Sequence, residues 1–345
     1  MTLPSKLMIT LAGLLFVVPV YSATLLVGNK SAASVNLIDL DSGETVATTE
    51  TREGPHEIAV SGDGKLAVVT NYGTGANPGN SLTVIEVEKG KAVGTIDLGE
   101  YSRPHGIVFM PDSRHVLVTA EGAKSLVKVD VYLGKVVKAV PTGQSTSHML
   151  AYDPSGMRAY VSNMGSASVS LIDVRHGELL SFESSGSGAE GIALGKNGLD
   201  LWVTNRGEDT VSLFDARYLR LLGKIDVGGF PIRAEVTPDG SRVLVSSARS
   251  GTLSVIDVAK RELVQQENLG LQLQGADKSL FGGQFGKSSI PIGIEIAPDG
   301  QRVWIAHAGI DRVQELDGES LKQTRIFSTG PEPDAMAYSP LKVKP

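Results

Sequence analysis

The sequence contains no cysteine among its 345 residues. This absence excludes disulfides, thiolate metal sites, a cysteine nucleophile and covalently attached c-type haem. Aromatic residues make up only 5% of the chain, the formal net charge is −6, and the basic residues are scattered, which argues against a nucleic-acid partner. Any bound metal would therefore have to be held by histidine, carboxylate or carbonyl groups.

Long hydrophobic runs are also scarce, and the one candidate lies at the N-terminus. Lys6 precedes a mostly apolar stretch over residues 7–20, and the small residue Ser22 follows. This pattern predicts a secretory signal peptide over residues 1–22, so the mature protein is expected to be periplasmic or secreted. As a helix the apolar stretch would span about 21 Å, short of the ~30 Å hydrocarbon core, and we expect no membrane span after cleavage. Loss of Lys6 takes the net charge from −6 to −7.

The main pattern in the sequence is an internal repeat. A four-residue slot, which reads Pro-His-Glu-Ile at residues 55–58 and Pro-His-Gly-Ile at residues 104–107, recurs in weaker form at residues 147–150, 189–192, 231–234, 291–294 and 333–336, seven copies in all. The spacings of 49, 43, 42, 42, 60 and 42 residues indicate a repeat fold. Three of the six histidines occupy the second position of this slot, namely His56, His105 and His148.

Each repeat contains four short runs rich in Val, Ile, Leu and Thr, separated by Gly, Asn and Asp. In residues 189–230 these runs are 191–194, 201–205, 210–215 and 221–227. The pattern predicts four antiparallel strands per unit, and seven units predict an all-β, seven-bladed β-propeller. We expect residues 23–345 to form this single domain.

The two ends of the chain are expected to complete one blade. Residues 25–29, 35–39 and 44–47 supply three strands, and residues 335–338 supply the fourth. Closure by both termini removes the open sheet edges that a linear stack would leave.

Segments 68–71, 159–163 and 201–205 end in Thr-Asn or Ser-Asn, and runs such as 169–173 follow them. They resemble the YVTN family of bacterial β-propeller repeats across essentially the whole mature chain. That resemblance implies a propeller fold but no single function, because similar propellers include periplasmic binding proteins, subunits of redox complexes, and relatives of lactonase and haem d1 propellers.

The repeated slot begins the first strand of each blade and should ring the mouth of the central channel. It brings together His56, His105, His148 and Glu190, a set that suits a transition metal such as Zn or Cu, with haem less favoured. Arg233 and Asp334 are expected to complete the ring. An alternative is that each imidazole is simply hydrogen-bonded within its blade.

A second polar ring is expected where the second strands end. Its predicted members are Asn71, Asn163, Asn205 and His307. Two insertions, at residues 73–80 and around residues 269–290, should open onto the same face, where long loops commonly bind ligands.

Three functions remain open from the sequence. The first is a binding or interaction module whose histidine-lined funnel holds a metal ion, a small molecule or a periplasmic protein partner. The second is a lactonase-like hydrolase or a lyase that uses His56, His105 or His148 with Glu190. The third is an accessory subunit or assembly factor of a periplasmic redox system. No Ser-His-Asp spacing, phosphate loop or HExxH motif identifies a reaction.

Overall fold

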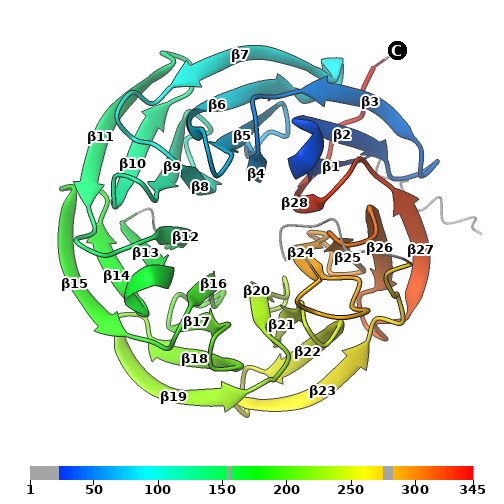
Figure 1. Cartoon of the computed structure of the whole chain (residues 1–345). Helices are drawn as coiled ribbons and strands as arrows, with labels where there is room; N and C mark the ends of the chain where they lie inside the picture. The colour runs from blue at the N-terminus through cyan, green and yellow to red at the C-terminus, as the bar shows by residue number, and fades with distance from the viewer. Residues whose placement is uncertain (1–22, 154, 156, 275–282, 345) are drawn as a thin grey trace, which may run out of the picture.

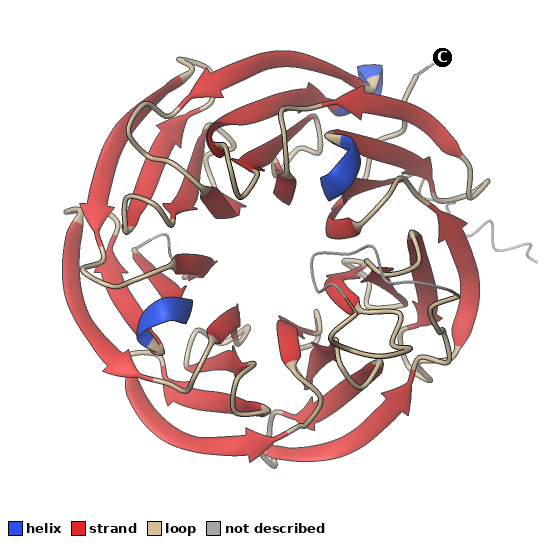
Figure 2. Cartoon of the chain, viewed as in Figure 1, coloured by secondary structure: helices blue, strands red, loops and turns tan. Residues whose placement is uncertain are grey.

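The computed structural model describes residues 23–153, 155, 157–274 and 283–344, so the predicted signal peptide lies outside the described residues. The strands form seven four-stranded sheets arranged around one axis, as Figure 1 shows. Strands and loops account for nearly all of the described chain (Figure 2), with three 3₁₀ turns at Lys30–Ala32, Val87–Lys89 and Met164–Ser166. The prediction of a seven-bladed propeller with four antiparallel strands per blade is confirmed.

Six blades follow the chain from the innermost strand outward. The first three are β4 (Pro55–Val60), β5 (Leu66–Gly73), β6 (Pro78–Glu86) and β7 (Lys91–Asp97); β8 (Pro104–Phe109), β9 (His115–Ala120), β10 (Ser125–Asp130) and β11 (Lys135–Pro141); and β12 (Ser147–Tyr152), β13 (Arg158–Asn163), β14 (Ser168–Asp173) and β15 (Glu178–Ser184). The next three are β16 (Ala189–Leu194), β17 (Asp200–Asn205), β18 (Thr210–Asp215) and β19 (Arg220–Asp226); β20 (Pro231–Val236), β21 (Arg242–Ser247), β22 (Thr252–Asp257) and β23 (Glu262–Asn268); and β24 (Pro291–Ile296), β25 (Arg302–His307), β26 (Arg312–Asp317) and β27 (Gln323–Ser328).

The remaining blade closes the ring with strands from both ends of the described chain. Its order is β28 (Pro333–Ser339), β1 (Thr24–Asn29), β2 (Ser34–Asp39) and β3 (Thr45–Glu50). Leu26 of β1 pairs with Ala337 on one side and with Leu37 on the other. The predicted closure by both termini is therefore confirmed, and the innermost strand is the last one along the chain.

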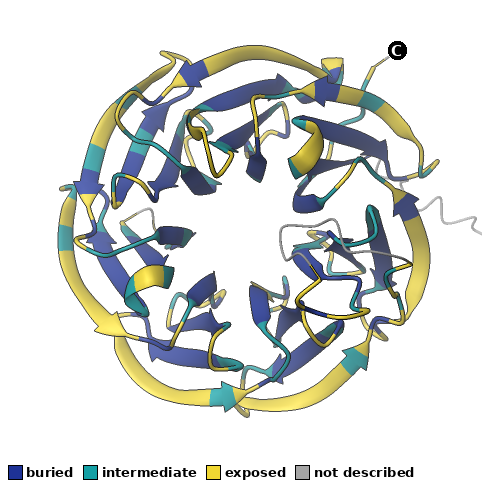
Figure 3. Cartoon of the chain, in the orientation of Figure 1, coloured by how far each residue is buried: buried dark blue, intermediate teal, exposed yellow. Residues whose placement is uncertain are grey.

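The hydrophobic core lies between adjacent blades. Middle strands such as β17 are buried along their whole length, while the outermost strands are largely exposed (Figure 3), because each sheet is covered on both faces by its neighbours. Trp202 has no exposed surface and packs with Val243 and Val245 of the next blade. This packing accounts for the near-continuous apolar runs of the second and third strands.

A bulge near the start of the innermost strands orients the site. In β4, Pro55 pairs with Asn71 but Ile58 pairs with Val69, so one extra residue sits on the inner strand. The same shift occurs in β8, β12, β16, β20 and β24. Neighbouring inner strands also approach closely, since a Cβ built on Gly191 would lie 2.3 Å from the Ile232 carbonyl oxygen. Glycine at that position is therefore required by contact with the next blade.

Among the described residues, no helix is long and apolar enough to cross a lipid bilayer.

Candidate functional site

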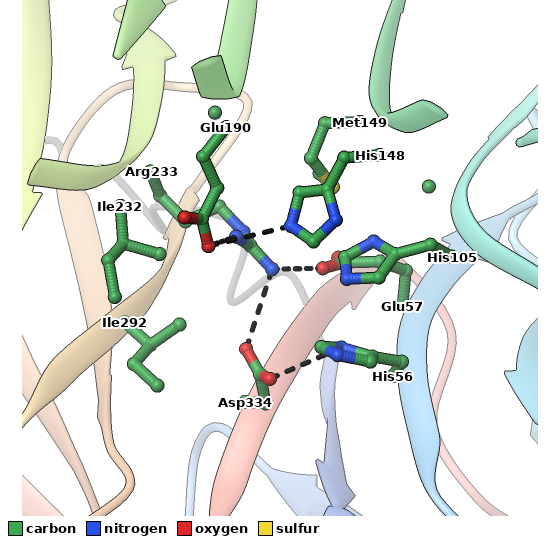
Figure 4. Close-up of polar contacts among 12 residues, drawn as sticks. His56, Glu57, His105, His148, Met149, Glu190, Ile232, Arg233, Ile292 and Asp334 are labelled. Atoms are coloured by element: carbon green, nitrogen blue, oxygen red, sulfur yellow. Dashed lines mark hydrogen bonds and ion pairs between the residues drawn. The ribbon is translucent and has the colours of Figure 1, made fainter. Parts of the chain in front are cut away.

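Side chains from all seven blades meet at one mouth of the central channel. The second residues of the innermost strands form a ring, which we call the hub ring; its members are His56, His105, His148, Glu190, Ile232, Ile292 and Asp334. Figure 4 shows them converging on one point. The structure thus places three histidines and two predicted acids together, with two isoleucines filling the remaining places.

The three imidazoles of the hub ring are stacked. The ring centroid of His105 lies 3.9 Å from that of His56 and 3.6 Å from that of His148. His105 has no exposed surface, and neither of its ring nitrogens has a hydrogen-bond partner among the described residues. Burial and the neighbouring charges, that of His148 first, lower the pKa of His105 well below its ordinary value. A buried polar side chain with both nitrogens unpartnered is costly, which suggests a role for it in binding.

His148 is held by a carboxylate that the sequence analysis did not select. Its Nδ1 lies 2.5 Å from Oε1 of Glu121, and its Nε2 lies 3.5 Å from Oε1 of Glu190 without forming a hydrogen bond. Burial by itself lowers the pKa of His148, but the two carboxylates outweigh burial and raise it. The Tyr72 hydroxyl donates a hydrogen bond of 2.6 Å to Oε2 of Glu121, so both oxygens of this carboxylate are engaged.

His56 has the opposite surroundings. Its Nδ1 lies 3.2 Å from Oδ2 of Asp334, and its Nε2 lies 2.9 Å from the ammonium of Lys30. Burial, followed by the positive charge of Lys30, lowers the pKa of His56 well below its ordinary value despite the carboxylate. Adjacent histidines of one ring are therefore driven toward different protonation states, which is common at functional sites.

Arg233 lies one residue further along its strand than the hub ring. The sequence analysis expected it within the ring, but Ile232 occupies that position because strand β20 follows the same register as its neighbours. The guanidinium donates to Glu57, which comes from the opposite side of the channel, and lies 3.5 Å from Asp334 and 3.8 Å from Glu190. Arg233 is only 7% exposed and pairs with both carboxylates of the hub ring, Glu190 and Asp334.

The expected second ring exists, but it is displaced by one residue. Asn71, Asn163 and Asn205 are fully buried and bond to Ser or Thr side chains of their own blades, and His307 bonds to Ser289 and Gln314. They do not line the funnel. The next residues along the chain do, because successive side chains point in opposite directions; these are Lys30, Tyr72, Glu121, Met164 and Arg206.

These two rings enclose a pocket of about 810 Å³, which we call the funnel. The inserted loop contributes residues 73–75 to its wall. Arg206 pairs with Glu190 at 2.8 Å and lies over the Phe230 ring, while Arg103 lies over the Tyr72 ring. A pocket of this size accommodates a small organic molecule, and its lining carries both cationic side chains and carboxylates.

Comparison with known proteins agrees with the architecture. The family model described as "Lactonase, 7-bladed beta-propeller" matches residues 20–268. A chain in the solved structure of Kuenenia stuttgartiensis hydrazine synthase has a similar fold, with a TM-score of 0.67 and 18% identity over 81% of this chain and 88% of that one. A functionally unknown protein from Desulfotomaculum acetoxidans has a TM-score of 0.76 and 15% identity over 92% of this chain and 99% of its own. No curated protein sequence matches. At these identities the two structures establish the fold alone.

Proposed function

Because the chain belongs to the lactonase seven-bladed β-propeller family, we propose that it hydrolyses a lactone, a cyclic ester, in the funnel. The observation that carries the proposal is a set of unpartnered imidazole nitrogens beside cationic side chains. Both ring nitrogens of His105 and Nε2 of His148 have no hydrogen-bond partner among the described residues. Lys30, which follows β1, and Arg206, which follows β17, line the same pocket from different blades.

The reaction needs three things that this arrangement supplies. The oxygen of a water molecule bonds to the carbonyl carbon, and its proton is taken up at the imidazole–carboxylate cluster. Negative charge that develops on the carbonyl oxygen is stabilised by Lys30 or Arg206. The ring carbon–oxygen bond then breaks, the alkoxide takes a proton, and a hydroxy acid results.

Direct attack by water is favoured over a serine nucleophile. Ser31 lines the funnel, but its hydroxyl donates to Glu332 at 2.5 Å and is not paired with an imidazole. A serine without a neighbouring base is a weak nucleophile.

The test is a panel of lactones, with and without a carboxylate substituent, and matching open-chain esters. The wild type should hydrolyse at least one lactone above background, and His105→Ala should not. His176→Ala is the matched control, because the His176 imidazole is exposed and, among the described residues, bonds only to Asp173 of its own blade. If wild type, His105→Ala and His176→Ala all match the background rate while melting normally, the hydrolase proposal is wrong.

Ligand binding without turnover is the second candidate, and one observation favours it. Three carboxylates at the hub ring, those of Glu57, Glu190 and Asp334, are already paired with arginine or lysine, which is an arrangement suited to holding a ligand in place. In that case the funnel would bind a hydroxy acid without converting the lactone. Calorimetry with both compounds, combined with product analysis, distinguishes the two candidates.

Export to the periplasm, a protein partner and a role in a redox system remain predictions from the sequence. Fractionation of cells that express the full chain, with the mass of the mature protein, tests export. An absorption spectrum that does not shift on adding haem would argue against the redox role.

A further inference from the structure

We propose that His105, Glu121 and His148 form a binding site for a divalent transition metal, with zinc as the reference ion. One nitrogen from each histidine and one carboxylate oxygen lie within 4.8 Å of one another. This set differs from the one expected from the sequence, because Glu121 takes the place of Glu190 and His56 is not a member. The inference deepens the proposed hydrolysis by naming what holds the attacking water, and it rests on that function for this last step only.

The first observation is the state of His105. It is fully buried, both of its nitrogens are unpartnered, and it belongs to both groups of potential ligands found near the axis. The second group combines it with His56 and Glu57, but Glu57 is bound to Arg233 and Nε2 of His56 faces Lys30. A cation would be repelled from that side, so the site with Glu121 is favoured.

The second observation is the charge on Glu121. Glu57, Glu190 and Asp334 each lie within 4.0 Å of Arg233, whereas no lysine or arginine among the described residues forms an ion pair with Glu121. Its partners are the Nδ1 of His148 and the Tyr72 hydroxyl. A metal that replaced the proton between Glu121 and His148 would supply a positive charge where no lysine or arginine of the described residues does.

The surrounding contacts fit metal ligation. Two imidazoles and one carboxylate with an open position are the donor set of many catalytic zinc sites. Tetrahedral bonds of about 2.1 Å would place the donor atoms about 3.4 Å from one another, which requires His105 and His148 to turn about their side-chain bonds. If His148 ligates through Nδ1, its Nε2 is directed at Glu190, 3.5 Å away, and such an outer carboxylate commonly orients a metal-bound histidine.

All three residues also line the funnel, and the small exposed fractions of Glu121 and His148, 8% and 6%, give an ion access to the site. A metal there would hold a water molecule against the substrate carbonyl, with Lys30 and Arg206 nearby.

The experiment measures zinc binding by untagged full-length protein. After dialysis against chelator, Zn²⁺ is titrated calorimetrically and metal content is measured. In a separate sample Co²⁺ is added, and the visible absorption spectrum is recorded for the bands of cobalt bound by nitrogen ligands. The wild type should bind one Zn²⁺ per chain and show these bands. Glu121→Gln, which keeps the shape of the side chain, should weaken Zn²⁺ binding at least about tenfold.

Glu53→Gln and His176→Ala are the controls. Glu53 lies on the same pocket wall outside the cluster, and His176 is an exposed histidine that could bind zinc adventitiously. Both variants should bind as the wild type does. Absence of bound Zn²⁺ in the wild type, or equal binding by Glu121→Gln, overturns the inference.

The two proposals can fail separately. Lactone hydrolysis that persists in chelator without bound metal leaves the hydrolase and removes the metal site. Zinc binding that depends on Glu121 in a protein that hydrolyses no lactone leaves the metal site and removes the hydrolase.

Discussion

Replacement of Arg233 by leucine is the sharpest test of how the centre of the propeller is stabilised. Arg233 is 7% exposed, and its guanidinium contacts three carboxylates from three other blades. Two of them keep another cation when it is lost, since Glu190 still pairs with Arg206 at 2.8 Å and Asp334 with Lys30 at 3.1 Å. Glu57 loses the only basic partner it has among the described residues.

The cost of the replacement should therefore come mainly from Glu57. Removing one member of a buried ion pair typically destabilises a protein by about 3–5 kcal/mol, because the other charge is left uncompensated. Arg233→Leu should lower the free energy of unfolding by this amount. Adding Glu57→Gln should recover more than half of it, since the neutral amide is cheaper to bury.

The effect should also depend on pH. Burial already raises the pKa of Glu57 to about 7 although Arg233 lowers it, and loss of Arg233 will raise it further. A carboxyl whose pKa is higher in the folded state than in the unfolded state loses stability as the pH rises toward the folded value. Arg233→Leu should therefore cost less at pH 5 than at pH 8.

Urea denaturation followed by tryptophan fluorescence measures these changes. Both tryptophans, Trp202 and Trp304, are fully buried, so unfolding exposes them to water. A loss below about 1 kcal/mol for Arg233→Leu, or no recovery in the double variant, would refute the argument.

Three further outcomes are expected. Trp202→Ala should lower the free energy of unfolding by about 3–5 kcal/mol because it empties a fully buried position between two blades, and an unchanged urea midpoint would contradict that placement. Burial lowers the pKa of His307 to about 4, so its contribution to the free energy of unfolding should be fully present above pH 6.5 and fall by up to about 3 kcal/mol toward pH 4. His307→Gln should remove this loss of stability in acid. Parallel plots of unfolding free energy against pH for the two proteins would count against the argument. Gly191→Ala should destabilise because its Cβ would meet a backbone oxygen at 2.3 Å, whereas Gly223→Ala, where a Cβ has open space, should have little effect; equal melting temperatures would disprove the contact.

The period of the sequence was sufficient to predict the architecture and to bring the three histidines, Glu190 and Asp334 to one ring, although it put Arg233 where Ile232 lies. Seven copies of one slot place equivalent residues around one axis, so His56, His105 and His148 could be assigned to one mouth without coordinates. The bulge in each inner strand could not be predicted from the period, but because every blade repeats it, the equivalence of the slots was preserved.

The funnel wall was predicted with an error of one residue. The repeat alignment marked Asn71 and Asn205 because they end their strands in the same way, but those side chains satisfy hydrogen bonds inside the blade. The residues that follow them, Tyr72 and Arg206, differ from copy to copy and face the funnel. Variation at an otherwise regular position was the available signal, and it would also have identified Glu121.

Pairing across the axis could not be inferred from the sequence. Glu57 and Arg233 are 176 residues apart and meet only because their blades stand on opposite sides of a narrow channel. Their contact depends on side-chain reach and channel width, and neither follows from a repeat length.

The strand that completes the ring also completes the site. Asp334 belongs to β28, which hydrogen-bonds to β1, and its carboxylate neutralises Lys30 from the turn that follows β1. During synthesis this acid emerges after the other six members of the hub ring, so a nascent chain holds a histidine cluster that is still short of one counter-charge. The pocket can therefore be completed only when β28 pairs with β1 and closes the ring. Chains that lack β28 should neither bind nor react as the full chain does.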